Sequence, residues 1–182
     1  SEMGNPYFSE LLHGIENEAA KLGYVVTIIL INETLEEKHR DIMSRGFAGI
    51  INLSNVPYEV PFMMELCENG VSLVNFDKDY SSIVYHDMAP SMRELVRRAH
   101  ELGHRKAAYI VGYSNYDVAK VDPRVEAYLE ECERLGFERY DLIYGDFPKR
   151  NSTALGYEGA MRVFGDNSDV TALFCINDIN AL

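Results

Sequence analysis

The sequence is short of the features that mark secreted, membrane-bound and metal-bound proteins. Its three cysteines, Cys67, Cys132 and Cys175, are odd in number and widely spaced, which favours free thiols over a disulfide framework or a zinc knuckle. No basic segment with an apolar stretch opens the chain, and no apolar run has the length of a membrane span. Unless a removed leader once preceded Ser1, we expect a cytoplasmic protein without membrane contact and without a metal.

Motifs that would indicate catalysis or nucleotide binding are also missing. The five histidines have no serine or cysteine beside them in a G-x-S-x-G turn, and no phosphate loop of the type G-x-x-x-x-G-K-[ST] or G-x-G-x-x-G follows a strand. We find no nucleophile paired with a base. The sequence therefore predicts a protein that is not an enzyme and carries no cofactor.

Basic residues are few relative to acidic ones. The chain has 17 Lys and Arg against 29 Asp and Glu, which gives a net charge of −12. Most of such a surface repels a polyanion, so any contact with DNA must come from elsewhere. Hydrophobic residues make up 47% of the 182 positions, enough for one good core or two small lobes.

The sequence does contain a repeated junction between helix and strand. Glycine is favoured just past a helix end because it adopts a left-handed backbone at little steric cost. Helices alternating with strands predict an α/β protein whose lobes are doubly wound, mainly parallel sheets. Six glycines each follow an amphipathic helical stretch and precede a β-type run, namely Gly23, Gly46, Gly70, Gly103, Gly136 and Gly165.

Hydrophobic periodicity places the individual elements. Asp122 and Pro123 suit the N-cap and first position of one helix. Two other helices have an apolar stripe, one of Phe8, Leu11, Leu12, Ile15, Ala19 and Leu22, the other of Met92, Leu95, Val96, Ala99 and Leu102. We expect helices at 8–22, 35–45, 62–67, 123–135 and 153–164, a long helix that ends at residue 102, and a helix that begins at residue 178. We expect strands at 24–31, 48–53, 71–76, 83–85, 107–111, 142–144 and 172–176.

The pattern of elements starts again after Gly103, so we expect two lobes, residues 1–103 and residues 104–182. Both ends look cut. The chain opens in a strand-to-helix loop without the strand that should precede it, and it stops about one turn into a helix. We therefore expect a first lobe that lacks its first strand and an incomplete second lobe, both pieces of a longer protein.

The loops that follow the strands form the candidate site, because ligands of such sheets bind beyond the carboxyl ends of the strands. These loops combine aromatic rings with carboxamides, carboxylates and fixed cations, which suits a polar, ring-shaped ligand such as a sugar. They are Asn5-Pro6-Tyr7-Phe8, Ser54-Asn55, Asp77-Lys78, the loop 113–124, Asp146-Phe147 and Asn177-Asp178.

Structural roles remain open for the same residues. Tyr7, Phe8 and Phe147 could be ordinary core residues. Asp178 could cap a helix, and Arg124 could pair with Glu126 or Glu130 on a charged helix. Their common location is the evidence for a site.

A series of short motifs runs in order along the whole chain: Asn5-Pro6-Tyr7-Phe8, Gly14-Ile15-Glu16, Gly49-Ile50-Ile51, Asp77-Lys78, Gly103-His104-Arg105-Lys106, Gly112, Arg124, Gly145-Asp146-Phe147, Gly156-Tyr157 and residues 171–178. Together they resemble the effector-binding core of the lactose/galactose repressor family. Periplasmic sugar-binding proteins share this core fold and are the nearest alternative. The stretch from Gly103 and the ending Asn177-Asp178 look more like the repressors.

The resemblance implies a two-lobed, periplasmic-binding-protein-like type I fold with the effector between the lobes. It implies an arginine that clamps the ligand, aromatic rings that stack on it, and carboxylate and carboxamide groups that bind its hydroxyls. The residues are Asn5, Tyr7, Phe8, Ser54, Asp77 and Lys78 from the first lobe, and Arg124, Phe147, Asn177 and, in a more structural role, Asp178 from the second.

The resemblance also implies a function, that of the regulatory core of a bacterial transcriptional repressor. The expected effector is a sugar or sugar derivative, the expected assembly is a homodimer, and operator DNA would be bound only through an N-terminal helix-turn-helix that this chain lacks. Two departures are Lys78, where many members have arginine, and Ala127, where glycine is usual. The alternatives are a secreted sugar receptor of a transporter and a flavodoxin-like or sugar-processing enzyme.

Overall fold

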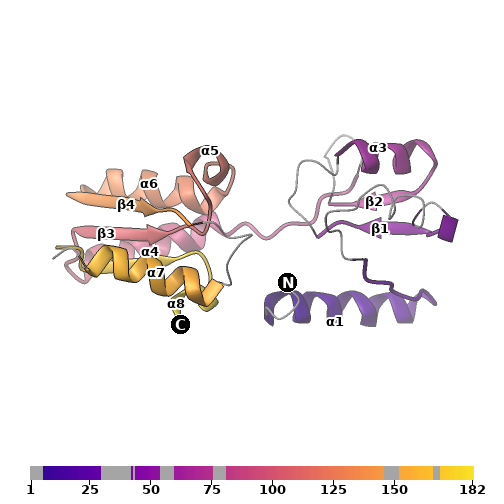
Figure 1. The fold of residues 1–182 in the computed structure, drawn as a ribbon, viewed down its shortest axis with the longest axis horizontal. Helices are drawn as coiled ribbons and strands as arrows, with labels where there is room; N and C mark the ends of the chain where they lie inside the picture. The colour runs from indigo at the N-terminus through magenta and orange to yellow at the C-terminus, as the bar shows by residue number, and fades with distance from the viewer. Residues whose placement is uncertain are drawn as a thin grey trace. The chain divides into compact units, whose positions relative to one another are not determined.

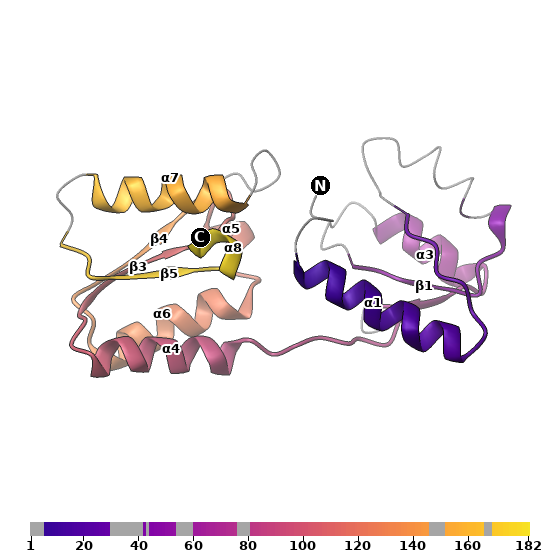
Figure 2. The ribbon, with the colours of Figure 1, turned by 90° about the horizontal axis from the view of Figure 1, so that it is seen from below.

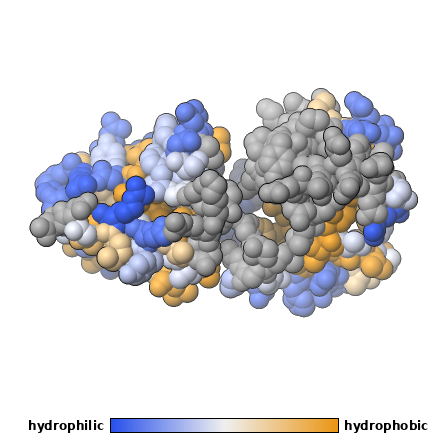
Figure 3. Space-filling view, viewed as in Figure 1, coloured by the Kyte–Doolittle hydropathy of each residue, from blue (hydrophilic) through white to orange (hydrophobic). Residues whose placement is uncertain are grey.

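The structure of the protein is a computed structural model that describes residues 6–29, 42, 44–53, 60–75, 81–145, 152–165 and 169–182. The chain divides into two compact units, Ser1–His86 and Asp87–Leu182, whose helices and strands are drawn in Figure 1. Hydrophilic and hydrophobic residues are interspersed on the visible face of the second unit (Figure 3). Among the helices of this described part, none is both long and apolar enough to cross a membrane.

The first unit contains a short parallel sheet. Strand β1 (Gly49–Ile51) pairs with strand β2 (Ser72–Val74), and helix α3 (Val60–Glu68) forms the crossover between them and packs on β2. Leu66 of α3 and Leu73 of β2 are buried together with Ile42. A strand, a helix and a parallel strand are the arrangement that the sequence predicts for this region.

Helix α1 (Pro6–Lys21) is amphipathic but buries no residue completely. Its half-buried side chains are those of the predicted stripe, Phe8, Leu11, Leu12, Ile15 and Ala19. Leu22 is the exception, because it lies past the helix end with 74% of its surface exposed. The helix and its apolar face are thus confirmed, whereas the core position of Leu22 is wrong.

Two predicted strands of the first unit are not strands where the structure describes them. Residues 24–29 have no ladder partner among the described residues, and Val25 is 93% exposed. The segment 83–85 is extended but exposed, and its only recorded pairing nearby is the single bridge between Val74 and Ser82. An apolar run becomes a strand only where another strand satisfies its backbone groups. Of the helix expected at 35–45, only residues 42, 44 and 45 are described, and these are helical.

The second unit is a three-layer α/β structure. Its strands are β3 (Lys106–Ile110), β4 (Arg139–Ile143) and β5 (Ala172–Cys175), all parallel, in the order β4-β3-β5. Helices α4 (Ala89–Glu101) and α6 (Pro123–Leu135) cover one face, and α7 (Ser152–Phe164) covers the other with α8 (Asp178–Ala181) beside it (Figure 2). The predicted α/β class with parallel strands is confirmed. A short helix, α5 (Tyr116–Ala119), was not expected.

Successive residues of the central strand β3 serve opposite faces, as the strand pleat requires. Tyr109 and Val111 belong to the main core with α4 and α6, whereas Ala108 packs with Val163 of α7 and with Val170. Tyr109 is fully buried, and its ring lies 5.1 Å from that of Tyr128 on α6. This double burial makes the sheet a rigid base for the loops at its carboxyl edge.

The apolar stripe of α4 is confirmed in part. Met92, Val96 and Ala99 are buried and face α6, but Leu95 and Leu102 are 56% and 63% exposed. Buried positions three and four residues apart follow the helical repeat, and Leu95, directly before Val96, is rotated out of that face. The expectation that Leu95 and Leu102 are core residues is therefore wrong.

Helix ends follow the predicted chemistry. Asp122 caps α6 by accepting a hydrogen bond from the backbone N–H of Arg124, Pro123 is the first helical residue, and Gly136 ends the helix with φ 71°. Five of the six junction glycines have positive φ, and Gly165 is the exception. Because α4 packs against α6, the second unit begins at Asp87, not at the boundary near Gly103 that the sequence suggests.

Candidate functional site

The carboxyl edge of the second unit's sheet holds a cluster built around Arg124. Arg124 Nε donates to Asp122 Oδ1 at 2.9 Å, and Nη2 donates to Asp122 Oδ2 at 2.6 Å. Its Nη1 donates to the backbone carbonyl of Ile176 at 2.7 Å, just past the end of β5. Tyr113, in the loop after β3, donates its hydroxyl to Asp122 Oδ2 at 3.0 Å. The cluster therefore joins the loops that follow two strands to the start of α6.

Burial and charge act against each other within this cluster. Burial alone raises the pKa of Asp122, which is 7% exposed, but the hydrogen bonds and charge of Arg124 outweigh it and leave the pKa below its ordinary value. For Arg124, burial lowers the pKa, but Asp122 more than compensates and raises it. Burial together with Asp122 raises the pKa of Tyr113 to about 12. At neutral pH the cluster is thus an ion pair with a neutral phenol.

Arg124 retains at least one donor beyond these contacts. A guanidinium group has five N–H bonds, and the recorded contacts with described residues use Nε and one hydrogen on each terminal nitrogen. Tyr113 also takes part in a side-chain hydrogen bond with Arg124, so the contacts with these described residues leave at least one terminal hydrogen unused, and the side chain is 23% exposed. A guanidinium group that protein contacts hold on one side can donate to ligand oxygen atoms on its other side.

Asn177 lies next to this cluster, because Arg124 binds the carbonyl of the preceding residue, Ile176. Asn177 is the N-cap of α8, and its Oδ1 accepts from the backbone N–H of Asn180 at 2.9 Å. Asp178 follows in the first turn and is exposed. The expectation that Asp178 caps this helix is therefore wrong by one residue. Arg124 is also not paired with Glu126 or Glu130, since its partner is Asp122.

In the first unit, Tyr7 and Phe8 lie in the first turn of α1. Their rings are 5.4 Å apart at an interplanar angle of 81°, an edge-to-face arrangement. Tyr7 is 62% exposed, so it is not a core residue, and Phe8 is half-buried. Five other predicted site residues lie outside the described residues: Asn5, Ser54, Asp77, Lys78 and Phe147. The ligand-binding role of the whole set stays a prediction.

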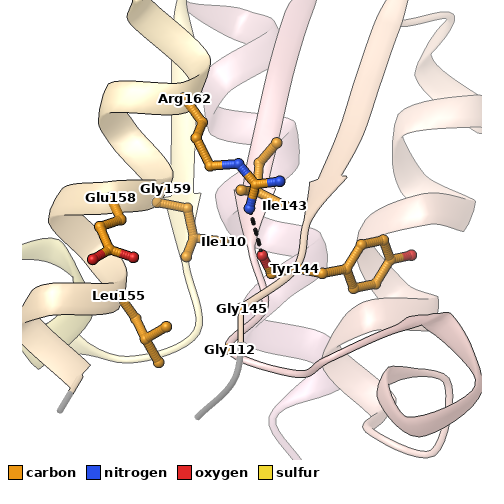
Figure 4. Close-up of a pocket in the computed structure, with 9 residues that line it drawn as sticks. All are labelled: Ile110, Gly112, Ile143, Tyr144, Gly145, Leu155, Glu158, Gly159 and Arg162. Atoms are coloured by element: carbon orange, nitrogen blue, oxygen red, sulfur yellow. Dashed lines mark hydrogen bonds between the residues drawn. The ribbon is translucent and has the colours of Figure 1, made fainter. Parts of the chain in front are cut away.

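A pocket that the sequence did not indicate lies on the α7 side of the second unit's sheet (Figure 4). It has a volume of about 200 Å³, and it is bounded by the ends of β3 and β4 and by α7. Arg162 reaches from α7 to donate to the carbonyl of Tyr144 at 2.9 Å. Its lining residues are Ile110, Gly112, Ile143, Tyr144, Gly145, Leu155, Glu158, Gly159 and Arg162.

Two glycines keep this pocket and the packing beside it open. A Cβ added at Gly159 would lie 2.7 Å from Ile110 Cδ1, and one at Gly145 would lie 2.6 Å from Leu155 Cδ2. Both are closer than real Cβ contacts, so larger residues would require movement. Gly145 belongs to the motif Gly145-Asp146-Phe147 of the sequence analysis. A glycine at the end of a strand is the sequence feature that could have indicated the close approach of Leu155 to the backbone here.

The expectation that the chain has no metal motif needs one correction. The run His100-Glu101-Leu102-Gly103-His104 does match the zinc spacing H-E-x-x-H. In the structure α4 ends at Glu101 and Gly103 has φ 93°, so the two histidines do not share one helical face. A hydrogen bond of 2.9 Å links His104 Nδ1 to Thr171 Oγ1. Among the described residues no group of three or more His, Cys, Asp or Glu side chains is placed to hold a metal.

Comparison with known proteins agrees with the fold and with the resemblance. No model of a known protein family matches the chain. The chain is 23% identical over 192 residues to the HTH-type transcriptional repressor PurR of Aliivibrio fischeri (strain ATCC 700601 / ES114), which covers 98% of this chain and 54% of the repressor. The chain thus spans about half the length of the curated relatives it matches.

Solved structures give the same result at the level of the fold. A LacI transcriptional regulator from a Rhodococcus species matches with a TM-score of 0.78 at 20% identity, covering 98% of this chain and 66% of that one. A LacI family regulator from Enterococcus faecalis V583, solved with bound ribose, matches with a TM-score of 0.77 at 17% identity, covering 98% and 65%. These likenesses confirm the periplasmic-binding-protein-like α/β fold that the sequence predicted. The recognition from sequence motifs is likewise confirmed, because the chain resembles the LacI-family transcriptional regulators over nearly its whole length.

Proposed function

We propose that this chain is the effector-binding core of a LacI-type bacterial transcriptional regulator and takes a small sugar-like ligand. The observation that carries the proposal is the Arg124 fork, which Asp122 and the Ile176 carbonyl hold at the carboxyl edge of a parallel sheet with 23% of the side chain exposed. Neighbouring hydroxyls of a sugar are suitable acceptors for such a fork. The similar regulator from Enterococcus faecalis was solved with ribose, and a similar one from Lactobacillus casei with glucose.

The remaining contacts follow from the same arrangement of loops. Arg124 and Asn177 lie together at one edge in the second unit, and Phe147 would stack on the ligand from the next loop. The first lobe would contribute Asn5, Tyr7, Phe8, Ser54, Asp77 and Lys78, and an exposed aromatic ring such as that of Tyr7 is of the type that stacks on a sugar. Asp178 would have a structural role in the first turn of α8, the helix that Asn177 caps.

Regulation would work by a shift in population between open and closed lobes. A ligand that contacts both lobes only when they are closed binds that state more tightly and so favours it. In the intact regulator, a homodimer in this proposal, the change would alter how paired helix-turn-helix domains fit their operator half-sites. One structural relative is a dimeric Lac repressor. We place the protein in the cytoplasm and assign it no catalytic activity.

Two alternatives make different predictions. A sugar receptor of a transporter shares the fold, but the PurR repressor and the Rhodococcus LacI regulator each match along 98% of the chain, which favours regulation. A helix-turn-helix encoded upstream supports the regulator, and a signal peptide there supports the receptor. A sugar-processing enzyme would convert its ligand, so turnover of a bound sugar that is lost in an Arg124 variant would contradict our proposal.

The test is thermal stabilisation of the intact protein by D-ribose, D-glucose, their phosphates and purine bases. A ligand at about 100 times its Kd should add roughly 2.7 kcal/mol to the stability of the folded state. Arg124→Ala should abolish the shift. Arg139→Ala is the matched control, because Arg139 is also paired with an aspartate, Asp141, but at an exposed position on β4. Unchanged affinity in Arg124→Ala would show that the site is placed wrongly.

A further inference from the structure

The cation of the proposed site is already neutralised within its own loop. Arg124 and Asp122 share two short contacts, Nε to Oδ1 at 2.9 Å and Nη2 to Oδ2 at 2.6 Å. This is the bidentate geometry in which an arginine otherwise grips a carboxylate or phosphate of a ligand. The side of the guanidinium group that would best bind an anionic ligand is therefore occupied by the protein.

Asp122 is also held by more contacts than the carboxylate of an exposed surface ion pair. Besides the two contacts to the Arg124 side chain, it accepts from the Arg124 backbone N–H at 2.9 Å and from the Tyr113 hydroxyl at 3.0 Å. With 7% of its surface exposed, it is nearly removed from solvent. A ligand anion that displaced it would leave a buried carboxylate without its cation, and such a separation is strongly unfavourable.

We propose, on the basis of the function proposed above, that Asp122 is a specificity-determining residue that makes the site select uncharged polyhydroxylated ligands over their anionic analogues. It does so by positioning Arg124 and cancelling its charge. An N–H group of Arg124 that its protein contacts leave unused donates to a hydroxyl oxygen without requiring a negative charge on the ligand. A phosphate or carboxylate that approaches the same group is attracted by Arg124 and repelled by Asp122 a few ångströms behind it. The net charge of −12 of the chain adds to this repulsion.

The decisive experiment compares charged and uncharged forms of one ligand. Titration calorimetry on the intact protein would measure the Kd of D-ribose against D-ribose 5-phosphate and of D-glucose against D-glucose 6-phosphate. Asp122→Asn keeps a good helix-capping residue of the same shape but removes the negative charge. We expect the wild type to prefer the uncharged sugar, and the variant to reduce that preference by about tenfold.

Asp141→Asn is the matched control. Asp141 is paired with Arg139 through a 2.6 Å contact to Nε, so its substitution makes the same change in total charge on a half-exposed strand residue. It should leave the preference for uncharged sugar unchanged. The salt dependence gives a second readout, since the affinity of the wild type for the uncharged sugar should be nearly the same at low and high salt.

The outcomes separate this inference from the proposed function. If Asp122→Asn weakens the sugar and its phosphate equally, Asp122 is only structural and the inference is wrong. A wild type that prefers the phosphorylated sugar also overturns it, while leaving Arg124 as a ligand residue. If the wild type binds neither form of either sugar, and no purine base, the proposed function fails and this inference fails with it.

Discussion

The two units share one pattern of helix, glycine and strand, but they bury their apolar residues to different extents. In the second unit a three-stranded sheet has helices on both faces, and Tyr109, Val96 and Tyr128 are fully buried. In the first unit the described sheet has two strands, and α1 buries no residue completely. Local sequence therefore predicts most of the described helices in both units. Complete burial depends on how much sheet surface each helix finds.

The largest expected effect comes from exchanging glycine for alanine in one helix of each unit. Gly156 lies within α7, and a Cβ there would overlap the backbone carbonyl of Asn180 in α8. Because the obstacle is backbone, Gly156→Ala should force α7 and α8 apart and lower the free energy of unfolding of the second unit by about 3 kcal/mol or more. Urea denaturation followed by circular dichroism measures this loss.

Gly14→Ala in α1 is the control with the opposite sign. None of the described residues lies within 4 Å of a Cβ at Gly14, so alanine adds helix propensity without a clash and should stabilise the first unit by about 0.5–1 kcal/mol. Hydrogen exchange assigns each change to its unit. Equal losses for both variants would contradict the difference in packing between α1 and α7.

The second prediction concerns one buried carboxylate. Glu131 of α6 is 5% exposed and accepts from Arg134 Nη2 at 2.6 Å and from Arg97 Nε of α4 at 2.9 Å. Arg134, and then Arg97, hold the pKa of Glu131 at about 2, below its ordinary value of 4.5. Glu131→Gln should therefore lower the free energy of unfolding by about 2 kcal/mol at pH 7.

The pH dependence follows from the sign of this shift. A carboxyl group with a lowered pKa in the folded state stabilises the protein fully above its unfolded pKa, and the contribution is lost as the pH falls from about 4.5 to about 2. The difference between the wild type and Glu131→Gln should shrink over that range in urea titrations. In the first unit Glu18 pairs with Lys21, but the two side chains are 71% and 66% exposed. Glu18→Gln should therefore change the stability by less than about 0.5 kcal/mol at any of these pH values.

Much of the second unit could be predicted from sequence because its signals are local. The bounds 123–135 for α6 follow from a capping aspartate, a proline at the first position and a closing glycine, and the structure has the same bounds. Such interactions lie within a few residues of one another. The strand predicted at 24–31 needed a distant partner that no local pattern supplies, and among residues 24–29 the structure shows no strand.

The candidate site was predictable by location but not by contact. The sequence placed Arg124 and Asn177 in loops at one edge of a sheet, and the structure does bring Arg124 to the residue before Asn177. The partner of Arg124 was missed because the prediction considered only the acidic residues Glu126 and Glu130 within the helix, whereas Asp122 precedes the helix and meets the side chain through its capping geometry. Side-chain orientation at a helix start depends on the loop that leads into it.

The third prediction, with a smaller expected loss than the first two, concerns the cost of a left-handed backbone at one helix end in each unit. Gly136 follows α6 with φ 71° and Gly23 follows α1 with φ 80°, and at either site a Cβ would have no atom of the structure's described part within 4 Å. Alanine should therefore cost only the strain of the left-handed conformation, about 1 kcal/mol in each case. Urea denaturation of Gly136→Ala and Gly23→Ala measures the two values. If they agree while Gly156→Ala and Gly14→Ala differ in sign, the two units share the physics of their helix ends and differ only in packing. A much larger loss for Gly136→Ala would show that the close packing of the second unit extends to its helix ends.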